Sequence, residues 1–334
     1  MSEVIIKAVN LTKAFGHLIA VDHINFEVYT GEIFGFLGPN GAGKSTTINM
    51  LTTVLRPTEG TAIVNGYNIV KEASKVRQTI GVVHQEYTAD EDLTGYENMM
   101  LAAALYGIPK SVAKERTEEL LKMVELTNAA NRKVETYSGG MRRRLEIAMG
   151  LINRPRILFL DEPTLGLDVQ TRAAIWSYIM KLKEEYNMTI FMTTHYLEEA
   201  DAYCDRIAII DRGKILKIGS PKELKEGLGG DIITIQIASN AEDAMKIISV
   251  HNEVTDVKAE KNTIRIKTKN ASALAPELIK ELYQKGINVT RIEIVQPSLD
   301  EVYLEYTGKS LRDEQVDWED MFTLRRTLRR ARGG

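Results

Sequence analysis

A strand, a glycine-rich loop and a helix follow one another near the N-terminus, and this succession restricts the chain to a small group of α/β folds. The loop satisfies the pattern G-x-x-x-x-G-K-[ST] and reads Gly38-Pro39-Asn40-Gly41-Ala42-Gly43-Lys44-Ser45-Thr46. The apolar run Ile33–Leu37 precedes it, and Ile48, Leu51 and Leu55 follow it at helical spacing. A glycine-rich loop that arises by chance would lack these flanking elements. The segment therefore predicts a phosphate loop.

Each part of this loop suits a phosphate group. Glycines let the backbone curl so that successive N–H groups point at phosphate oxygens, and the helix N-terminus adds a favourable dipole. Lys44 can reach the β- and γ-phosphates, and the Ser45 hydroxyl can ligate Mg²⁺. The loop predicts that the chain binds a nucleoside triphosphate.

Two adjacent carboxylates follow a second apolar run. Ile157–Leu160 is typical of a buried parallel strand, and Asp161 and Glu162 stand at its C-terminal end, where ligands bind in open α/β sheets. Asp161 can hold Mg²⁺ through water, and Glu162 can orient and polarise an attacking water. The alternative is ordinary helix-start chemistry, because Pro163 and Thr164 follow. Next to a phosphate loop, the pair favours phosphoryl transfer.

A third segment, Ser138-Gly139-Gly140, precedes the predicted helix Met141–Ile152. Serine suits a helix N-cap, and two glycines leave backbone N–H groups uncovered, so the segment is a second candidate phosphate site. Taken alone, it indicates only a capped helix after a turn. One nucleotide already has its phosphate loop, so a second anion site requires a different phosphate or a different subunit.

These segments, in this order, resemble the nucleotide-binding subunit of an ATP-binding cassette (ABC) transporter. The resemblance covers Val4 to Leu224 and includes Tyr137-Ser138-Gly139-Gly140-Met141. It implies an α/β fold of the P-loop ATPase type, with a mixed sheet core, an antiparallel β part and a helical insertion at about residues 86–137. It also implies ATP and Mg²⁺ as cofactors, with Lys44 and Glu162 taking part in hydrolysis.

The resemblance assigns roles to four further places. It implies that Phe15 stacks on adenine, that Gln85 ligates Mg²⁺ and senses the membrane partner, and that His195 contacts the γ-phosphate. The loop Gly166-Leu167-Asp168 matches the one that crosses between subunits. Ser138-Gly139-Gly140 of one subunit then closes over the nucleotide held by the other.

Each of these assignments has a plainer alternative. Phe15 would otherwise pack in a core, Gln85 would be an ordinary polar loop residue, and His195 would cap the next helix or be a hydrogen-bonded core histidine. The run Arg142-Arg143-Arg144 is expected to form a solvated helix face with ion pairs.

Two departures from the general family pattern place the chain in one branch. Tyr137 stands where leucine is usual and Met141 where glutamine is usual, as in the branch that resembles daunorubicin-resistance and other drug exporters. The segment Pro297–Tyr303 resembles the ending of that branch. The Ser138-Gly139-Gly140 site itself is intact.

Composition fits a cytosolic subunit, and the resemblance implies that it is peripheral, on the cytoplasmic face of the cell membrane. The chain has 334 residues with 43 basic and 46 acidic side chains, a balance that argues against a general nucleic-acid-binding surface. Cys204 is the single cysteine, which suits a reducing compartment. The N-terminus lacks the features of a signal peptide, and no apolar run approaches the ~18 residues that span a bilayer. A transport channel would then lie in another chain, an integral-membrane permease.

The pattern predicts two domains and a tail. The cassette is expected at residues 1–227, with strands Glu3–Val9, Val21–Tyr29 and Thr61–Val64 and helices Tyr96–Tyr106 and Ser111–Leu126. A glycine-rich break precedes an accessory α+β domain expected at residues 231–307. Residues 308–334 are expected to form a frayed, arginine-rich tail, and the alternative is contact with the membrane surface or the permease. The accessory domain is expected to be ferredoxin-like, β-α-β-β-α-β, with elements Ile232–Ala238, Ala241–Val250, Val254–Lys258, Thr263–Thr268, Ala275–Lys285 and Asn288–Val295.

Other classes of P-loop protein would differ from this chain in the segments that they contain. A DNA-repair ATPase would have a long coiled coil between the phosphate loop and Ser138, a translation factor would have two cassettes, and a P-loop kinase would lack Ser138-Gly139-Gly140. We therefore expect an ATP-hydrolysing subunit of an ABC exporter of drugs, antibiotics or other small molecules, working as a homodimer or heterodimer of cassettes. The alternative is a non-transport ABC ATPase that acts as a regulatory or nucleic-acid-associated module.

Overall fold

The computed structural model describes residues 3–227, 230–238, 241–295 and 298–307. The predicted tail, residues 308–334, lies outside the described residues. The chain forms two compact units that divide between Ile218 and Gly219, and each unit is considered by itself. Among the described residues, no helix combines the length and apolar character needed to cross a membrane.

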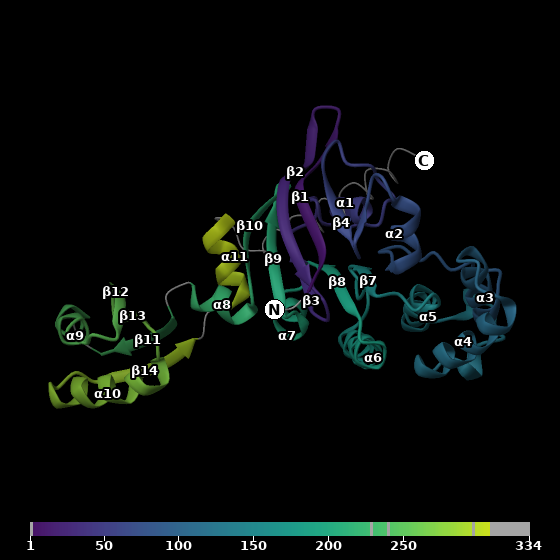
Figure 1. Ribbon diagram of the computed structural model, residues 1–334. Helices are drawn as coiled ribbons and strands as arrows, with labels where there is room; N and C mark the ends of the chain where they lie inside the picture. The colour runs from purple at the N-terminus through teal and green to yellow at the C-terminus, as the bar shows by residue number, and fades with distance from the viewer. Residues whose placement is uncertain (1–2, 228–229, 239–240, 296–297, 308–334) are drawn as a thin grey trace, which may run out of the picture. The chain divides into compact units, whose positions relative to one another are not determined.

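The first unit contains a six-stranded sheet with the strand order β10-β9-β3-β8-β7-β6 (Figure 1). β3 pairs with β8 and β9 in parallel, and β7 pairs in parallel with β6 and β8. Every residue of β3, β7 and β8 is buried, as expected for central strands covered on both faces. The strands are β3 (Ile33–Leu37), β6 (Ile80–Val83), β7 (Ile157–Asp161), β8 (Thr189–Thr194), β9 (Arg206–Asp211) and β10 (Lys214–Gly219).

A second, antiparallel sheet has the order β2-β1-β4-β5. Its strands are β1 (Val4–Phe15), β2 (Leu18–Tyr29), β4 (Glu59–Val64) and β5 (Tyr67–Asn68). Phe26 of this sheet packs against Phe34, Phe36 and Phe191 of the first sheet, with ring centroids 5.1–6.0 Å apart. One apolar core therefore joins both sheets and includes Ile48 of the helix after the phosphate loop.

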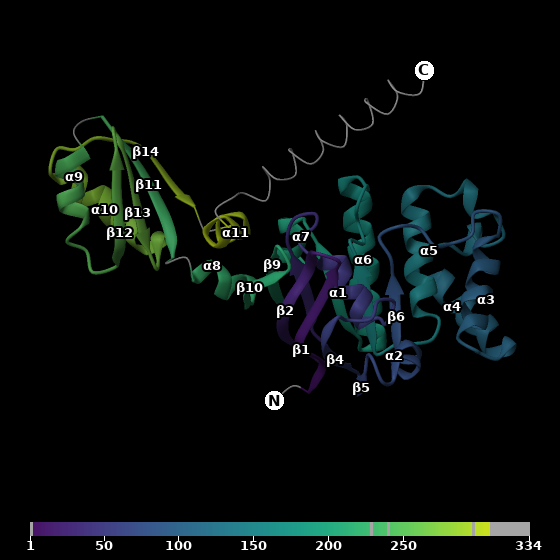
Figure 2. The ribbon, with the colours of Figure 1, turned by 90° about the horizontal axis from the view of Figure 1, so that it is seen from above.

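The helical insertion stands beyond β6, where its helices pack against one another and against α5 (Figures 1 and 2). A capping box fixes the start of α3, because the Thr94 hydroxyl accepts from the Glu97 N–H and the Glu97 carboxylate accepts from the Thr94 N–H. The helices of this unit are α1 (Lys44–Leu51), α2 (Ala73–Thr79), α3 (Gly95–Leu105), α4 (Lys110–Met123), α5 (Gly139–Leu151), α6 (Val169–Tyr186) and α7 (Leu197–Tyr203), with short 3₁₀ turns at Thr127–Ala129 and Val134–Thr136.

The second unit contains a four-stranded sheet with the order β12-β13-β11-β14, in which all neighbours are antiparallel. This order and the sequence of elements are those of a ferredoxin-like fold, as predicted. Buried residues of the sheet and of the helices α9 and α10 form a separate core. The elements are α8 (Pro221–Glu226), β11 (Asp231–Ile237), α9 (Ala241–Ile248), β12 (Val254–Glu260), β13 (Thr263–Thr268), α10 (Ala271–Gln284), β14 (Val289–Val295) and α11 (Leu299–Thr307).

Helix α8 belongs to this second unit, although the sequence analysis placed residues 221–227 at the end of the cassette. The reason is that α8 packs against α11, the last described helix, and that Leu224 of α8 and Val302 and Tyr303 of α11 are buried. The first and last helices of the unit thus lie together.

Candidate functional site

The phosphate loop joins β3 to α1 and exposes backbone donors at the helix start. Gly43 has φ +102°, and a Cβ there would lie 2.5 Å from the carbonyl oxygen of Ala20, so only glycine fits this position. Gly43 is also the N-cap of α1, and no side chain caps the helix. The N–H groups of the first turn are therefore available to an anion, with the helix dipole behind them.

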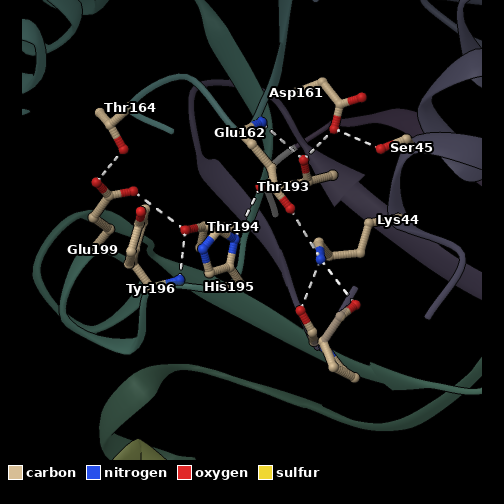
Figure 3. Close-up of polar contacts among 12 residues, drawn as sticks. Lys44, Ser45, Asp161, Glu162, Thr164, Thr193, Thr194, His195, Tyr196 and Glu199 are labelled. Carbon is tan, nitrogen blue, oxygen red and sulfur yellow. Dashed lines mark hydrogen bonds and ion pairs between the residues drawn. The ribbon is translucent and has the colours of Figure 1, made fainter. Parts of the chain in front are cut away.

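Lys44 lies in the centre of the site and is only 4% exposed. Its Nζ donates to the carbonyl oxygens of Gly38 at 2.8 Å and Pro39 at 3.0 Å, and lies 3.1 Å from Oε1 of Glu162 (Figure 3). A buried ammonium needs such partners, because burial without them is costly. The lysine is thus held between the phosphate loop and the acidic pair that follows β7.

Glu162 has an unusual backbone and contacts both a lysine and a histidine. Its φ of +47° lies in the left-handed region, which costs a non-glycine residue about 1–3 kcal/mol and is typical of functional sites. Oε2 lies 2.9 Å from Nδ1 of His195. Burial alone raises the pKa of Glu162, but the hydrogen bond with His195 and the charge of Lys44 outweigh it and lower this pKa to about 2. The carboxylate is therefore ionised at neutral pH.

Asp161 is held by two hydroxyl groups. Ser45 Oγ donates to its Oδ1 at 3.1 Å and Thr193 Oγ1 donates to the same oxygen at 2.5 Å. Burial is the main influence on the carboxyl group and raises its pKa, against the effect of these hydrogen bonds. A hydroxyl from the phosphate loop and a buried carboxylate thus converge, and all their donor atoms are oxygens. This donor set fits Mg²⁺, which binds few protein ligands beside phosphates and water.

A third buried carboxylate lies next to the segments that carry these residues. Glu199, on α7, accepts hydrogen bonds from the hydroxyls of Thr164 and, at 3.2 Å, of Thr194 (Figure 3). Thr164 follows the acidic pair and Thr194 precedes His195, so Glu199 joins the two segments that carry Glu162 and His195. The sequence analysis did not single out Glu199, which lies in an acidic stretch at a helix start.

The structure therefore brings together five of the predicted site residues. They come from the C-terminal ends of β7 and β8 and from the start of α1, which follows β3, because neighbouring parallel strands end at the same edge of the sheet. The five are Lys44, Ser45, Asp161, Glu162 and His195.

Phe15 and Gln85 lie outside this cluster. Phe15 is the last residue of β1 and is 48% exposed, and Nζ of Lys13 lies 5.1 Å from the centroid of its ring. It is not a core residue, so its face remains available for stacking. Gln85 is exposed two residues after β6. Its backbone carbonyl accepts a hydrogen bond from Arg143.

Three further predicted residues, Ser138, Gly139 and Asp168, lie at helix starts. Ser138 is exposed and is the N-cap of α5, where its hydroxyl accepts from the N–H of Met141 at 3.3 Å. Gly139 is exposed too, and its carbonyl accepts from the Tyr87 hydroxyl at 3.3 Å. Asp168 caps α6 through Thr171, whose hydrogen bonds lower the pKa of Asp168. These contacts are structural, and they leave the surfaces of Ser138 and Gly139 open.

The expectation of a solvated arginine face on α5 is wrong for one of the three arginines. Arg142 pairs with Glu91, and Arg144 donates to the carbonyl of Val124, but Arg143 is only 1% exposed. The helix is buried on most sides, so position 143 faces the interior. The sequence held a signal for this: Arg143 and Glu146 lie one turn apart, and the residues after Glu146 are apolar up to Ile152.

The sequence matches two protein families. Residues 21–165 match the family described as ABC transporter, and residues 219–307 match the family described as ATP-binding protein DrrA1-3-like, C-terminal domain. The linearmycin resistance ATP-binding protein of Bacillus subtilis is 39% identical over 312 residues, which cover 92% of this chain and 100% of that protein. The chain belongs to the ATP-binding proteins of ABC transporters. As a member of this family it binds and hydrolyses ATP.

Further relatives support the same branch. The doxorubicin resistance ATP-binding protein of Mycobacterium tuberculosis is 38% identical over 310 residues, covering 91% of this chain and 93% of that protein. The Nod factor export ATP-binding protein I of Sinorhizobium fredii is 36% identical over 313 residues, covering 93% of this chain and 88% of that protein. The resemblance to the drug-resistance branch is thus confirmed.

Solved structures of ABC ATPases resemble the first unit. A dimeric ATP-binding cassette in a post-hydrolysis state, bound to ADP and Pi, aligns with a TM-score of 0.59 at 31% identity and covers 64% of this chain and 98% of that one. The cbiO1 protein of Clostridium perfringens, part of an ABC transporter complex, aligns with a TM-score of 0.62 at 28% identity and covers 66% of this chain and 90% of that one. The predicted cassette fold is confirmed.

Proposed function

We propose that this ATPase energises an ABC exporter of drugs, antibiotics or other small molecules, and that two cassettes close head to tail over ATP. The relatives named for linearmycin resistance, doxorubicin resistance and Nod factor export support the export direction. The partner is an integral-membrane permease, and the subunit works at the cytoplasmic face of the membrane.

The observation that carries the closure proposal is that the phosphate-handling groups occupy two separate places. Lys44, Asp161, Glu162 and His195 form one buried cluster. Ser138 and Gly139 are exposed, and their hydrogen bonds are made within α5 and to Tyr87. An anion site that faces outward can serve the nucleotide of a second subunit, which is the head-to-tail arrangement.

In the closed state each residue has a defined task. Lys44 turns its ammonium to the β- and γ-phosphates, while Ser45 and Asp161 hold Mg²⁺, which neutralises phosphate charge when bound. Glu162 is ionised and orients the attacking water, and His195 contacts the γ-phosphate. Phe15 stacks on adenine, Gln85 would serve as a further ligand of Mg²⁺, and Asp168 belongs to the loop that would cross to the partner subunit.

A cavity between the insertion and the sheet supports the contact with a membrane partner. It has a volume of about 540 Å³ and is lined by residues from the end of α1, from α2 and β6, and from α3 and α5. Three apolar residues at its rim are exposed: Val54 by 62%, Leu105 by 82% and Tyr106 by 37%. Exposed apolar residues around a hollow are typical of a protein interface. We place a cytoplasmic segment of the permease here.

The head-to-tail arrangement is tested by mixing two inactive variants. Lys44→Ala should weaken ATP binding directly, because it removes the cation that faces the phosphates. Ser138→Arg should leave ATP binding by the monomer nearly intact but abolish hydrolysis, because it blocks only the partner's site. A mixture contains dimers in which an intact Lys44 faces an intact Ser138, so ATPase activity should partly return.

Two results would contradict this arrangement. An equal loss of ATP affinity in both variants, measured by calorimetry, would place Ser138 in the pocket of its own subunit. A mixture as inactive as its two components, at concentrations where the parent protein is active, would argue against a composite site that works alone.

A further inference from the structure

The segment after β6 is fastened to α5 by a buried arginine. Nη1 of Arg143 donates to the carbonyl oxygen of His84 at 2.7 Å, and Nη2 donates to the carbonyl oxygen of Gln85 at 2.9 Å. The guanidinium carbon lies 5.2 Å from the ring centroid of Tyr87. One planar group therefore holds two consecutive peptide carbonyls and stacks beside a third residue of the same segment.

Burial of the Arg143 guanidinium is unfavourable, so its presence in the interior requires an explanation. Arg143 is 1% exposed, and within the described part of the chain no carboxylate forms an ion pair with it. Burial lowers the pKa of Arg143. The two carbonyl dipoles and the aromatic ring offset part of the desolvation cost. An apolar side chain would avoid this cost altogether, so packing alone does not explain an arginine here.

Glu146 strengthens the same attachment from the next turn of α5. Its Oε1 accepts from the backbone N–H groups of Thr88 at 2.6 Å and of Ala89 at 2.7 Å, and Oε2 accepts from the Thr88 hydroxyl at 2.7 Å. Arg143 thus binds the carbonyls at the start of the segment, and Glu146 binds the amides at its end. Gln85 itself belongs to the first of these anchored points, because Arg143 binds its carbonyl.

Two fixed carbonyls on either side of one Cα determine the direction of its side chain. The peptide that enters Gln85 carries the carbonyl of His84, and the peptide that leaves it carries its own carbonyl. With both held by one guanidinium, φ and ψ of Gln85 are restrained, and its Cβ can point in only a narrow range of directions.

We propose that Arg143 is a positioning residue that aims Gln85 at the magnesium–triphosphate group. The proposal deepens the proposed function, because it rests on the role given there to Gln85. A lysine at position 143 would keep the positive charge but could not bind both carbonyls in one plane. Replacing Arg143 by lysine should therefore raise the Mg²⁺ concentration that nucleotide binding requires, and not only lower the stability of the fold.

The test uses the full chain and a readout that does not involve turnover. Binding of the β,γ-imido analogue of ATP is measured by calorimetry over a range of Mg²⁺ concentrations for Arg143→Lys, Gln85→Ala and the double variant. The Mg²⁺ concentration that gives half of the full effect should rise about tenfold in Arg143→Lys and in Gln85→Ala, as found when groups that orient metal ligands are replaced. Arg144→Lys is the matched control, because it alters the neighbouring arginine, which donates to the carbonyl oxygen of Val124. This variant should need the same Mg²⁺ concentration as the parent protein.

The double variant separates positioning from a general structural effect. If Arg143 acts through Gln85, Arg143→Lys should add no further shift in the Gln85→Ala background. An equal shift in both backgrounds, or a lower melting temperature with an unchanged Mg²⁺ requirement, overturns the proposal. An unchanged requirement in Gln85→Ala overturns it together with the magnesium role of Gln85, whereas an unchanged requirement in Arg143→Lys alone overturns only the positioning role.

Discussion

Glu162 combines three features that are rarely found in one residue. Its backbone is left-handed, its carboxylate is buried, and each of its oxygens lies within 3.1 Å of a nitrogen, on Lys44 or on His195. Packing does not require any of these, and strain at a buried charged residue is expected where geometry serves chemistry. The carboxylate is held in one orientation at the edge of the sheet where phosphate is expected.

Replacing this carboxylate by an amide should separate hydrolysis from binding. We expect Glu162→Gln to bind ATP while its turnover falls by at least about 10²-fold, because the water loses its general base. The ATP-bound dimer should then accumulate and elute earlier in size-exclusion chromatography. Glu185→Gln, an exposed glutamate on α6, is the matched control and should retain parental activity. A Glu162→Gln variant that turns over at the parental rate would refute the assignment.

At single residues, sequence reasoning succeeded where strand ends decide position. Asp161 and Glu162 could be placed at the ligand-binding edge because they follow a buried parallel strand. His195 was assigned only through the family resemblance, and the structure places it beside Glu162. It failed for Arg143, because a run of three arginines indicates a solvated face unless the helix is known to be buried on most sides. It also missed Glu199, whose partners are threonines on segments distant in the sequence.

Among the elements, prediction was most accurate where the local pattern matched the final environment. β3 has the predicted bounds Ile33–Leu37, because a short, wholly apolar run is what a strand buried on both faces requires. β1 extends six residues beyond its predicted end at Val9. This part of the strand contains Asn10, with φ +46°, and several shifts in its register with β2. Such irregularities interrupt the alternation from which strands are read.

Helix α10 begins four residues earlier than predicted, at Ala271. Pro276 lies inside it, and proline argues against helix in the residues before it. The Asn270 side chain caps the helix by accepting from the N–H of Ala273 at 3.2 Å, and Ala271 and Leu274 are buried. Tertiary packing and the cap therefore outweigh the local cost of the proline.

The end of α3 offers a direct test of the surface assigned to the membrane partner. Leu105 is 82% exposed at the rim of the cavity, so a charge there should cost the fold little but should oppose burial against a partner. We expect Leu105→Asp to bind ATP as the parent does but to co-purify with the permease at least about tenfold less well. Val250→Asp, which alters a residue 79% exposed in the second unit, is the matched control. Undiminished co-purification of Leu105→Asp would exclude this surface.

At the scale of the whole molecule, each of the two units buries apolar residues of its own within the part of the chain that the structure describes. The phosphate loop, the acidic pair and His195 all belong to the first unit, whereas the second has a core of its own between its sheet and helices. The sequence indicated both units, but it placed the boundary after α8, since a local pattern cannot reveal that α8 packs against α11, more than seventy residues later. A chain shortened at Gly227 would retain α8 without that partner, so the informative truncation ends at Ile218.

We expect the chain that ends at Ile218 to retain ATP binding, because every residue of the buried cluster precedes this point. We propose that the second unit holds two subunits near each other between ATP-driven closures. The effective concentration of one cassette near the other would then be on the order of 1 mM. Its removal should make specific ATPase activity depend more steeply on subunit concentration, with little change at saturation. A chain that ends at Thr307 lacks only residues 308–334 and is the matched control. If the curves of specific activity against concentration for the Ile218 truncation and the full chain superimpose, the second unit does not hold subunits together and serves the permease or a regulator instead.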